Sequence, residues 1–479
     1  MARSSDRRRL ALLTCCFGLF MAQLDATIVN VGLPSIQRGL GADIAGLQWV
    51  VDAYVLVLGS LAISAGAAGD RLGRRRVFRV GLVTFTLASL GCGLAPALGV
   101  LVAFRALQGA GAAMLMPSTL AIIADVFTEP RERAAAIGTW AGVAGLSMVA
   151  GPLLGGALVD GVGWRALFWV NLPVGVLALR MAARFVPESR APRPRALDLR
   201  GQALLVGALA LLTFALIEAP GWGWASAPTL GLLGLAIAAA ALFAAVERRA
   251  AEPLLDPRLL RRPALGGASA FAVLAYAATA GFLFLNTLYL QQVRGYSPLR
   301  AGLAILPMTV AVAIAAPLAG RLAGRGGPRP IIAGAGLLIA AAMGVLATVS
   351  PGTPYPVLLV AYALLGVGWG TINPPITTLA ISALPRARSG LASAVAGSAR
   401  QVGALVGVAL MGSLVAGRLA STAGPGEFTS AIHLGYLVGV GAGAGIVLLA
   451  WAIPLRGPGR QAAAPPGTAG RPTSVASSR

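Results

Sequence analysis

The chain has 479 residues, of which 57% are hydrophobic and 11% charged. Soluble domains carry about a quarter charged residues, so this composition excludes an ordinary soluble globule and predicts a membrane protein. The net charge is +22, and all 38 basic residues are arginine. These arginines stand between long apolar runs and not beside stacking aromatic residues, so a nucleic-acid partner is not expected.

Apolar runs of about 20 residues, the length that crosses a bilayer, occur about fourteen times, although another count stays open for the alanine-rich runs. The predicted spans are 10–32, 47–69, 77–96, 99–124, 135–159, 166–186, 200–219, 229–249, 264–291, 299–322, 329–350, 356–384, 388–417 and 431–455. We therefore expect an all-α polytopic membrane protein. Its predicted parts are an arm at 1–9, a six-helix bundle at 10–190, a linker with two inserted spans at 191–262, a second six-helix bundle at 263–455 and a disordered tail at 456–479.

The arginine clusters predict the orientation of these spans. Clusters at 3–9, 71–79, 131–133, 180–200, 248–262, 321–329, 386–388 and 456–479 all fall on one face of the membrane. Cytoplasmic loops retain positive residues, so both termini are expected in the cytoplasm, at the plasma membrane of a bacterium. A cleaved signal peptide over the first run is the alternative, but no convincing cleavage site follows that run.

Ionisable residues inside spans cost about 2.5–3.5 kcal/mol each at a helix centre, and therefore mark function. Asp25 and Asn30 lie in the first span, Asp52 in the second, and Arg105 and Gln108 on one face of the fourth. We expect these five residues in a proton-coupling region and substrate cavity, where Asp25 exchanges a proton beside Arg105. A static Asp25–Arg105 ion pair is the alternative, and Asp52 could instead lie at the outer surface.

The loop after the second span carries a predicted cytoplasmic latch made of Gly66, Asp70, Arg71, Gly73 and Arg74. Its glycines permit a tight turn, and its aspartate can pair with an arginine. The alternative is that a short cytoplasmic loop merely attracts arginine. A partial repeat at 320–329 indicates two related halves, but Gly324 replaces the aspartate there, so an Asp-based latch is expected only in the first half.

The fifth span contains Gly151, Pro152 and Gly155 within a dense group of small residues. Small residues allow close helix packing, and proline removes a backbone hydrogen bond and permits a bend. We expect a helix that rocks against a neighbour, with packing alone as the alternative.

These segments together resemble the major facilitator superfamily, and specifically its branch of fourteen-span drug:proton antiporters. Arg105–Gly109 is similar to the fourth-helix Arg-x-x-Gln-Gly motif, and the glycine–proline segment from Gly151 to Gly155 resembles the antiporter motif. Ser147 departs from that motif, which usually has glycine there. The stretches 24–34 and 163–175 also match segments typical of this branch.

The resemblance implies two bundles around a midplane cavity and export of amphipathic or cationic organic compounds, such as antibiotics, in exchange for protons. It places Asp25 and Arg105 in the coupling region, Asp70 and Arg71 in the latch, and Gly151 and Pro152 in the bending helix. We expect a monomer in contact with anionic lipid headgroups, with no cofactor and no metal, powered by the proton gradient.

Other functions stay open at this level. Export of one self-made antibiotic or metabolite, or proton-coupled uptake, fits the same architecture. An enzyme is disfavoured because the chain has one histidine and no cluster of catalytic groups. A channel is disfavoured because no segment resembles a selectivity filter.

Overall fold

A computed structural model describes residues 2–192, 196–385, 389–420 and 425–454. Every regular element in these ranges is helical, and 14 helical segments are long and apolar enough to cross a membrane. The prediction of an all-α polytopic membrane protein is therefore confirmed. The tail predicted at 456–479 lies outside the described residues.

The first bundle consists of α1 (Ala2–Leu40), α2 (Ile44–Leu72), α3 (Arg74–Leu94), α4 (Leu98–Val126), α5 (Pro130–Gly161), α6 (Ala166–Trp169) and α7 (Asn171–Phe185). The inserted pair is α8 (Leu199–Trp222) and α9 (Ala227–Glu247), followed by the short η1 (Pro257–Arg261). The second bundle consists of α10 (Pro263–Leu288), η2 (Tyr289–Val293), α11 (Pro298–Ala304), α12 (Leu306–Gly326), α13 (Pro328–Leu346), α14 (Tyr355–Ser382), α15 (Ser389–Ala420) and α16 (Pro425–Ala452).

Local sequence signals explain several helix boundaries. The Asp43 carboxylate accepts a hydrogen bond from the Gly46 N–H at 2.8 Å and caps the start of α2. Gly73, with φ of 116°, makes the turn between α2 and α3, a conformation that disfavours any side chain. Pro130 begins α5 behind the Glu129 cap. Helix α1 begins at Ala2, so residues 2–9 of the segment expected as an arm are helical and continuous with the helix of the first span.

Two predicted spans contain a break. The span that starts at Ala166 divides at Val170 into α6 and α7. The span that starts at Pro298 divides at Ile305 into α11 and α12, and Pro307 lies in the first turn of α12. Tyr289–Val293 forms a π-helical turn at the end of α10. Such irregular turns frequently accompany function, and two of these three flank the cavity described below.

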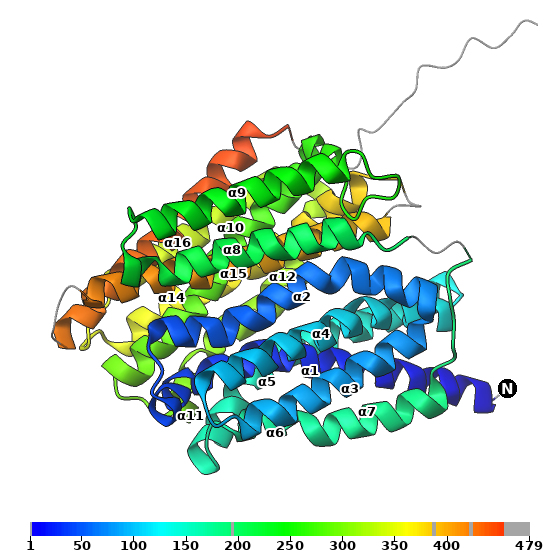
Figure 1. Ribbon diagram of the computed structural model, residues 1–479, viewed down its shortest axis with the longest axis horizontal. Coiled ribbons are helices and arrows are strands. Elements are labelled where there is room, and N and C mark those ends of the chain that lie inside the picture. Colours follow the sequence, from blue (N-terminus) through cyan, green and yellow to red (C-terminus); the bar gives the residue numbers. More distant parts are fainter. Residues whose placement is uncertain (1, 193–195, 386–388, 421–424, 455–479) are drawn as a thin grey trace, which may run out of the picture.

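The two bundles lie side by side, α8 lies along the seam between them, and α9 packs against α8 (Figure 1). Helix α2 packs against α15 of the other bundle, and α8 contacts both of these helices. Helix α5 packs against α1 and, across the bundles, against α11. The inserted pair therefore attaches to the edge of the two-bundle core without entering it.

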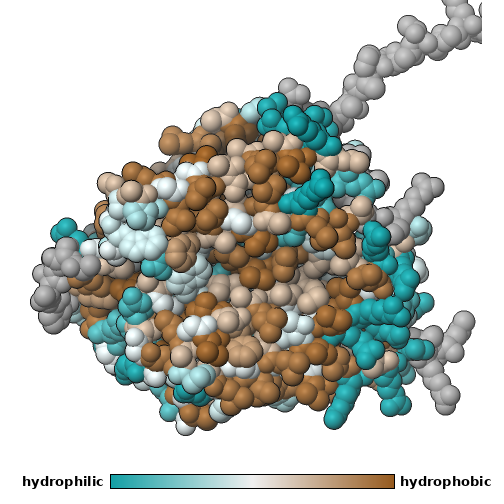
Figure 2. Space-filling view, viewed as in Figure 1, coloured by the Kyte–Doolittle hydropathy of each residue, from teal (hydrophilic) through white to brown (hydrophobic). Residues whose placement is uncertain are grey.

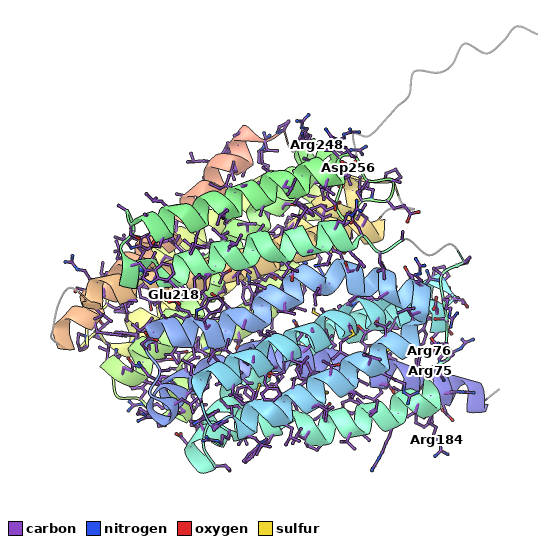
Figure 3. The ribbon with its side chains drawn as sticks, viewed as in Figure 1. Arg75, Arg76, Arg184, Glu218, Arg248 and Asp256 are labelled. Carbon is purple, nitrogen blue, oxygen red and sulfur yellow. The ribbon has the colours of Figure 1, made fainter. Side chains whose placement is uncertain are left out.

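The surface shows a broad apolar belt with hydrophilic residues gathered at one end (Figure 2). Arg75, Arg76, Arg184 and Arg248 lie at this end, which also holds the N-terminus, and Glu218 lies toward the other (Figures 1 and 3). We call these the arginine-rich end and the opposite end. The belt between them matches the apolar surface that a bilayer requires.

Candidate functional site

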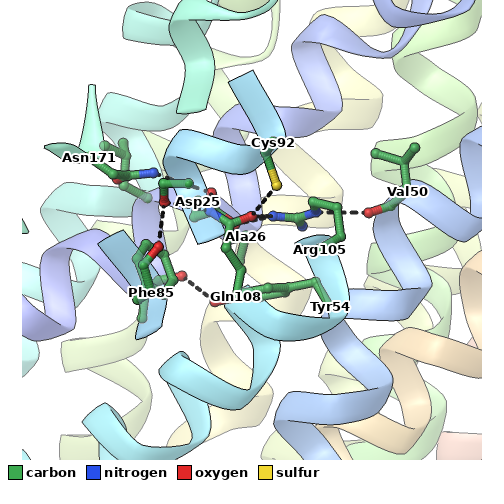
Figure 4. Close-up of polar contacts among 12 residues, drawn as sticks. Asp25, Ala26, Val50, Tyr54, Phe85, Cys92, Arg105, Gln108 and Asn171 are labelled. Carbon is green, nitrogen blue, oxygen red and sulfur yellow. Dashed lines mark hydrogen bonds and ion pairs between the residues drawn. The ribbon is translucent and has the colours of Figure 1, made fainter. Parts of the chain in front are cut away.

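A buried ion pair lies inside the first bundle. The Asp25 carboxylate of α1 pairs with the Arg105 guanidinium of α4, and the two residues are 0% and 1% exposed (Figure 4). The Arg105 Nε–H also donates to the Val50 carbonyl oxygen of α2 at 2.9 Å. Three helices of one bundle therefore meet at the charged pair that the sequence predicts.

Amide side chains complete the hydrogen bonds of this carboxylate. The Gln108 Nε2–H donates to Asp25 at 3.0 Å, and the Asn171 Nδ2–H donates to the same oxygen at 3.4 Å. Gln108 Oε1 accepts from Arg105 at 2.9 Å, and Gln108 Nε2 also donates to the Ser89 hydroxyl at 2.8 Å. We call Asp25, Arg105, Gln108, Asn171 and Ser89 the Asp25 network. It reaches α1, α3, α4 and α7, so a change in the charge of Asp25 acts on four helices.

Aromatic rings enclose the guanidinium. The Arg105 Cζ atom lies 4.4 Å from the centre of the Tyr54 ring and 5.9 Å from that of Phe168. The Tyr54 hydroxyl donates to the Ala22 carbonyl oxygen at 2.9 Å, which fixes its ring beside the cation. Neutralising one partner of a charge pair so completely removed from water destabilises the fold by roughly 3–5 kcal/mol. Protonation of Asp25 therefore has a large energetic consequence in this bundle.

Asn30 belongs to a different surface of α1. It stands five residues after Asp25, which is about 140° around the helix, so the two side chains diverge. Asn30 lines a narrow cavity between the bundles, with about 30 Å³ of water-accessible space. The cavity is lined by Thr27, Asn30, Val31, Met148, Pro152, Leu283, Asn286, Thr287, Leu290, Gln291, Ala301, Gly302, Ile305, Met308, Thr309 and Trp369. The five predicted residues thus divide among three places: Asp25, Arg105 and Gln108 belong to the network, Asn30 lines the cavity, and Asp52 lies elsewhere.

Asp52 is completely buried in α2, and neither carboxylate oxygen has a hydrogen-bond partner. It shares one face of α2 with Gln48 and Gly59, since the three are four and seven residues apart. The Gln48 Nε2–H donates to the Val408 and Ala409 carbonyl oxygens of α15 at 2.9 and 2.7 Å. A Cβ on Gly59 would lie 2.6 Å from that of Gln401, also on α15. Asp52 therefore faces the seam between the bundles and not the outer surface.

The bundles are joined in the half of the molecule that lies toward the opposite end. Gln291 of η2 donates to the Val31 carbonyl oxygen at 2.8 Å, and Gln292 donates to Gln37 at 2.6 Å. The Leu299 N–H donates to Asp160 at 3.0 Å, at the end of α5. These contacts close the opposite end, so a drug-sized ligand needs the bundles to move before it can occupy the cavity.

The small residues of α5 make this closure possible. A Cβ on Gly151 would lie 2.1 Å from the Thr27 hydroxyl oxygen, and one on Gly156 would lie 2.5 Å from the Leu299 Cα. On α11, a Cβ on Gly302 would lie 2.2 Å from the Pro152 carbonyl oxygen. Gly155 makes the same kind of close approach to Ile28. Helix α5 thus touches α1 on one side and the second bundle on the other.

The predicted latch holds an arginine between two carboxylates. Arg74 donates to Asp70 at 2.8 Å and to Asp125 of α4 at 2.5 Å. The backbone then ties the segment after α7 to this loop, because the Arg74 N–H donates to the Ser189 carbonyl oxygen at 2.9 Å and the Ala191 N–H to that of Asp70 at 3.0 Å. A Cβ added to Gly66 would lie 3.5 Å from the Cβ of Pro117. The Arg71 side chain is exposed.

Sequence reasoning assigned no role to several of these partners. Asp125 lies at the end of the fourth span, where an acidic residue is unremarkable. Asn171 lies in the stretch 163–175, which matches a segment typical of the fourteen-span branch, and this match is the one sequence feature that could have marked Asn171 as functional. Ser89 and Tyr54 carry no signal in the sequence, since small polar and aromatic residues are common in spans.

The fold and this site define a class of protein, the polytopic transporters with two helical bundles and a cavity between them. Residues 15–408 match the family model of the Major Facilitator Superfamily, and the chain belongs to that family.

Relatives and solved structures support the same assignment. The chain is 43% identical over 418 residues to the multidrug resistance protein Stp of Mycobacterium tuberculosis, covering 87% of this chain and 77% of that one. It is 38% identical over 410 residues to the tetracenomycin C resistance and export protein of Streptomyces glaucescens, covering 85% and 76%. A crystal structure of the peptide transporter POT in complex with sulfate has a TM-score of 0.68 at 16% identity, covering 92% and 94%, and so shares the fold.

Proposed function

We propose that this protein exports small organic compounds, including antibiotics, in exchange for protons that move inward. The names of the relatives, which include a multidrug resistance protein and an export protein, support the direction of transport and the substrate class. The Asp25 network carries the proposal of proton coupling, because it is a completely buried carboxylate whose charge is balanced by one arginine.

The proposed cycle uses the two separate places described above. When Asp25 takes a proton, its pairing with Arg105 weakens and four helices of the first bundle lose a shared anchor. The bundles can then change their arrangement around the cavity, where the substrate binds. Release of the proton on the other side restores the pair, so proton movement and substrate movement are coupled through helix positions and not through direct contact.

Asp52 is a second candidate for protonation. An isolated carboxylate is far too costly to bury unpaired, so we infer that Asp52 carries a proton while the α2–α15 seam is closed. Opening of the seam would admit water and allow the proton to leave. This proposal makes the seam itself sensitive to protonation.

The orientation follows from the arginines. The arginine-rich end lies in the cytoplasm with both termini and contacts anionic headgroups, and the protein works as a monomer without a cofactor. Closure at the opposite end then describes a state with its outer side shut. The energy source is the proton gradient across the plasma membrane.

Transport into inside-out vesicles tests this function. Vesicles that contain the protein should accumulate organic compounds from a panel of uncharged and cationic antibiotics when a proton gradient is imposed, and addition of a transported compound should partly collapse the gradient. Asp25→Asn should abolish the coupled transport, while Asp6→Asn, an exposed change on the same helix, should leave it intact. Coupled transport that persists in Asp25→Asn would refute the role of Asp25.

A further inference from the structure

The cavity between the bundles has an unusual distribution of polar groups. Its described lining includes no acidic or basic side chain. The threonine hydroxyls donate within their own helices, for example Thr287 to the Leu283 carbonyl oxygen at 3.0 Å and Thr309 to that of Leu306 at 2.9 Å. Most of its polar groups are therefore already satisfied by the protein.

Two lining groups are not satisfied. The Nδ2–H₂ of Asn286 on α10 and the Nε1–H of Trp369 on α14 are buried and have no hydrogen-bond partner. Among the buried side-chain atoms without a partner in the described part of the chain, these are the ones that belong to cavity-lining residues. Both are donors, and buried donors need an acceptor.

The protein holds both side chains in place. The Asn286 side chain is 1% exposed, and its Oδ1 accepts from the Tyr362 hydroxyl at 2.7 Å, which leaves its amide hydrogens for another partner. The Trp369 ring packs edge-on against Tyr276 at 5.7 Å between ring centres. The donors are thus set by contacts behind them, as in a binding site that is built before the ligand arrives.

We propose that Asn286 and Trp369 form a donor pair that binds oxygen acceptors of the exported compound, and that the cavity selects uncharged compounds with carbonyl groups. This inference rests on the proposed function and names its substrate class. A cation gains little here, because the cavity lining supplies no carboxylate and Asp25 is occupied by Arg105. A carbonyl oxygen of the compound gains a hydrogen bond from these donors, and the apolar remainder of the lining does not compete for it.

A binding experiment with matched probes tests the donor pair. Purified protein in nanodiscs is dialysed against radiolabelled anthraquinone or anthracene, which share a ring skeleton and differ in two carbonyl groups, and against ethidium as a planar cation. We expect the wild type to bind anthraquinone more tightly than anthracene. Equal binding of the two would overturn the inference.

Two substitutions remove one donor each. Trp369→Phe keeps an aromatic ring against Tyr276, and Asn286→Leu keeps a side chain of similar size while it removes the amide, including the oxygen that Tyr362 uses. Each should weaken anthraquinone binding by about three- to tenfold and leave anthracene unchanged. Thr139→Val, an exposed residue outside the cavity whose hydroxyl donates within α5, is the control and should alter none of the three.

The outcomes separate this inference from the proposed function. Equal weakening for all three probes would show that the substitutions damage the fold of the cavity, and would overturn the donor role. Selective weakening for anthraquinone, without any proton-driven movement of it in vesicles, would uphold the donor pair and refute the proposed export.

Discussion

The contact between α5 and α11 offers the sharpest quantitative prediction. Gly302 has no room for a side chain, since an added Cβ would lie 2.2 Å from the Pro152 carbonyl oxygen, while ordinary contacts begin at 3.4 Å. The obstructing atom belongs to the backbone of α5 and cannot rotate away. Gly302→Ala therefore forces the two helices apart by about 1 Å, an overpacking that costs about 1–3 kcal/mol.

This cost falls on one state of the transport cycle. The contact lies toward the opposite end, which the proposed cycle must open, so the alternative state does not bear the cost. A free-energy difference of about 1–3 kcal/mol changes the ratio of the two states by about 5- to 150-fold. Gly302→Ala should therefore populate the state in which the opposite end is open, and should slow transport.

Spin-label distances measure this shift directly. Labels at Val162, which follows α5, and at Arg300 of α11 report the separation of the bundles at this end, and both sites are exposed. Gly302→Ala should move the distance distribution toward longer values. Gly142→Ala, where an added Cβ meets nothing within 4 Å, is the matched control on α5. An unchanged distribution in Gly302→Ala would refute the assignment of this contact to one state.

Two further predictions concern the latch and the seam. Arg74→Ala leaves Asp70 and Asp125 facing each other without a cation. Because both carboxylates are about one-third exposed, the loss of folding stability should be modest, about 1 kcal/mol, while the loss of transport rate should be larger. An unaltered transport rate in vesicles would contradict a conformational role for the latch. Asp52→Asn should retain or raise the melting temperature, because the residue it replaces is an unpaired buried acid, yet should shift the dependence of transport on pH. A fall in melting temperature as large as that of Asp25→Asn would mean that Asp52 has a charged partner after all.

The sequence was a good guide where one physical signal dominated. The spans could be predicted because hydropathy and length alone define a membrane helix, and the 14 predicted spans correspond to 14 helical segments of suitable length and hydropathy in the described part of the chain. The pairing of Asp25 with Arg105 could be anticipated because buried charges require partners. Each of these inferences depends on local sequence and one general rule.

The separation of Asn30 from Asp25 shows where such inference stopped. Both residues stand in one motif, but they point in directions about 140° apart, and the faces that they meet depend on how α1 packs against α5 and α10. The donor pair has the same origin. Asn286 and Trp369 are ordinary in sequence, and their lack of partners follows from the relative positions of several helices.

In the proposed cycle Asp25 exchanges a proton as substrate binds, and a measurement of proton release on binding tests this exchange. Purified protein in weakly buffered nanodiscs is mixed with a compound that the wild type transports, and the change in pH is recorded. The account predicts release of protons by the wild type and by Asp6→Asn, with the Asp25-dependent part absent in Asp25→Asn. Equal proton release by Asp25→Asn and the wild type would contradict the account.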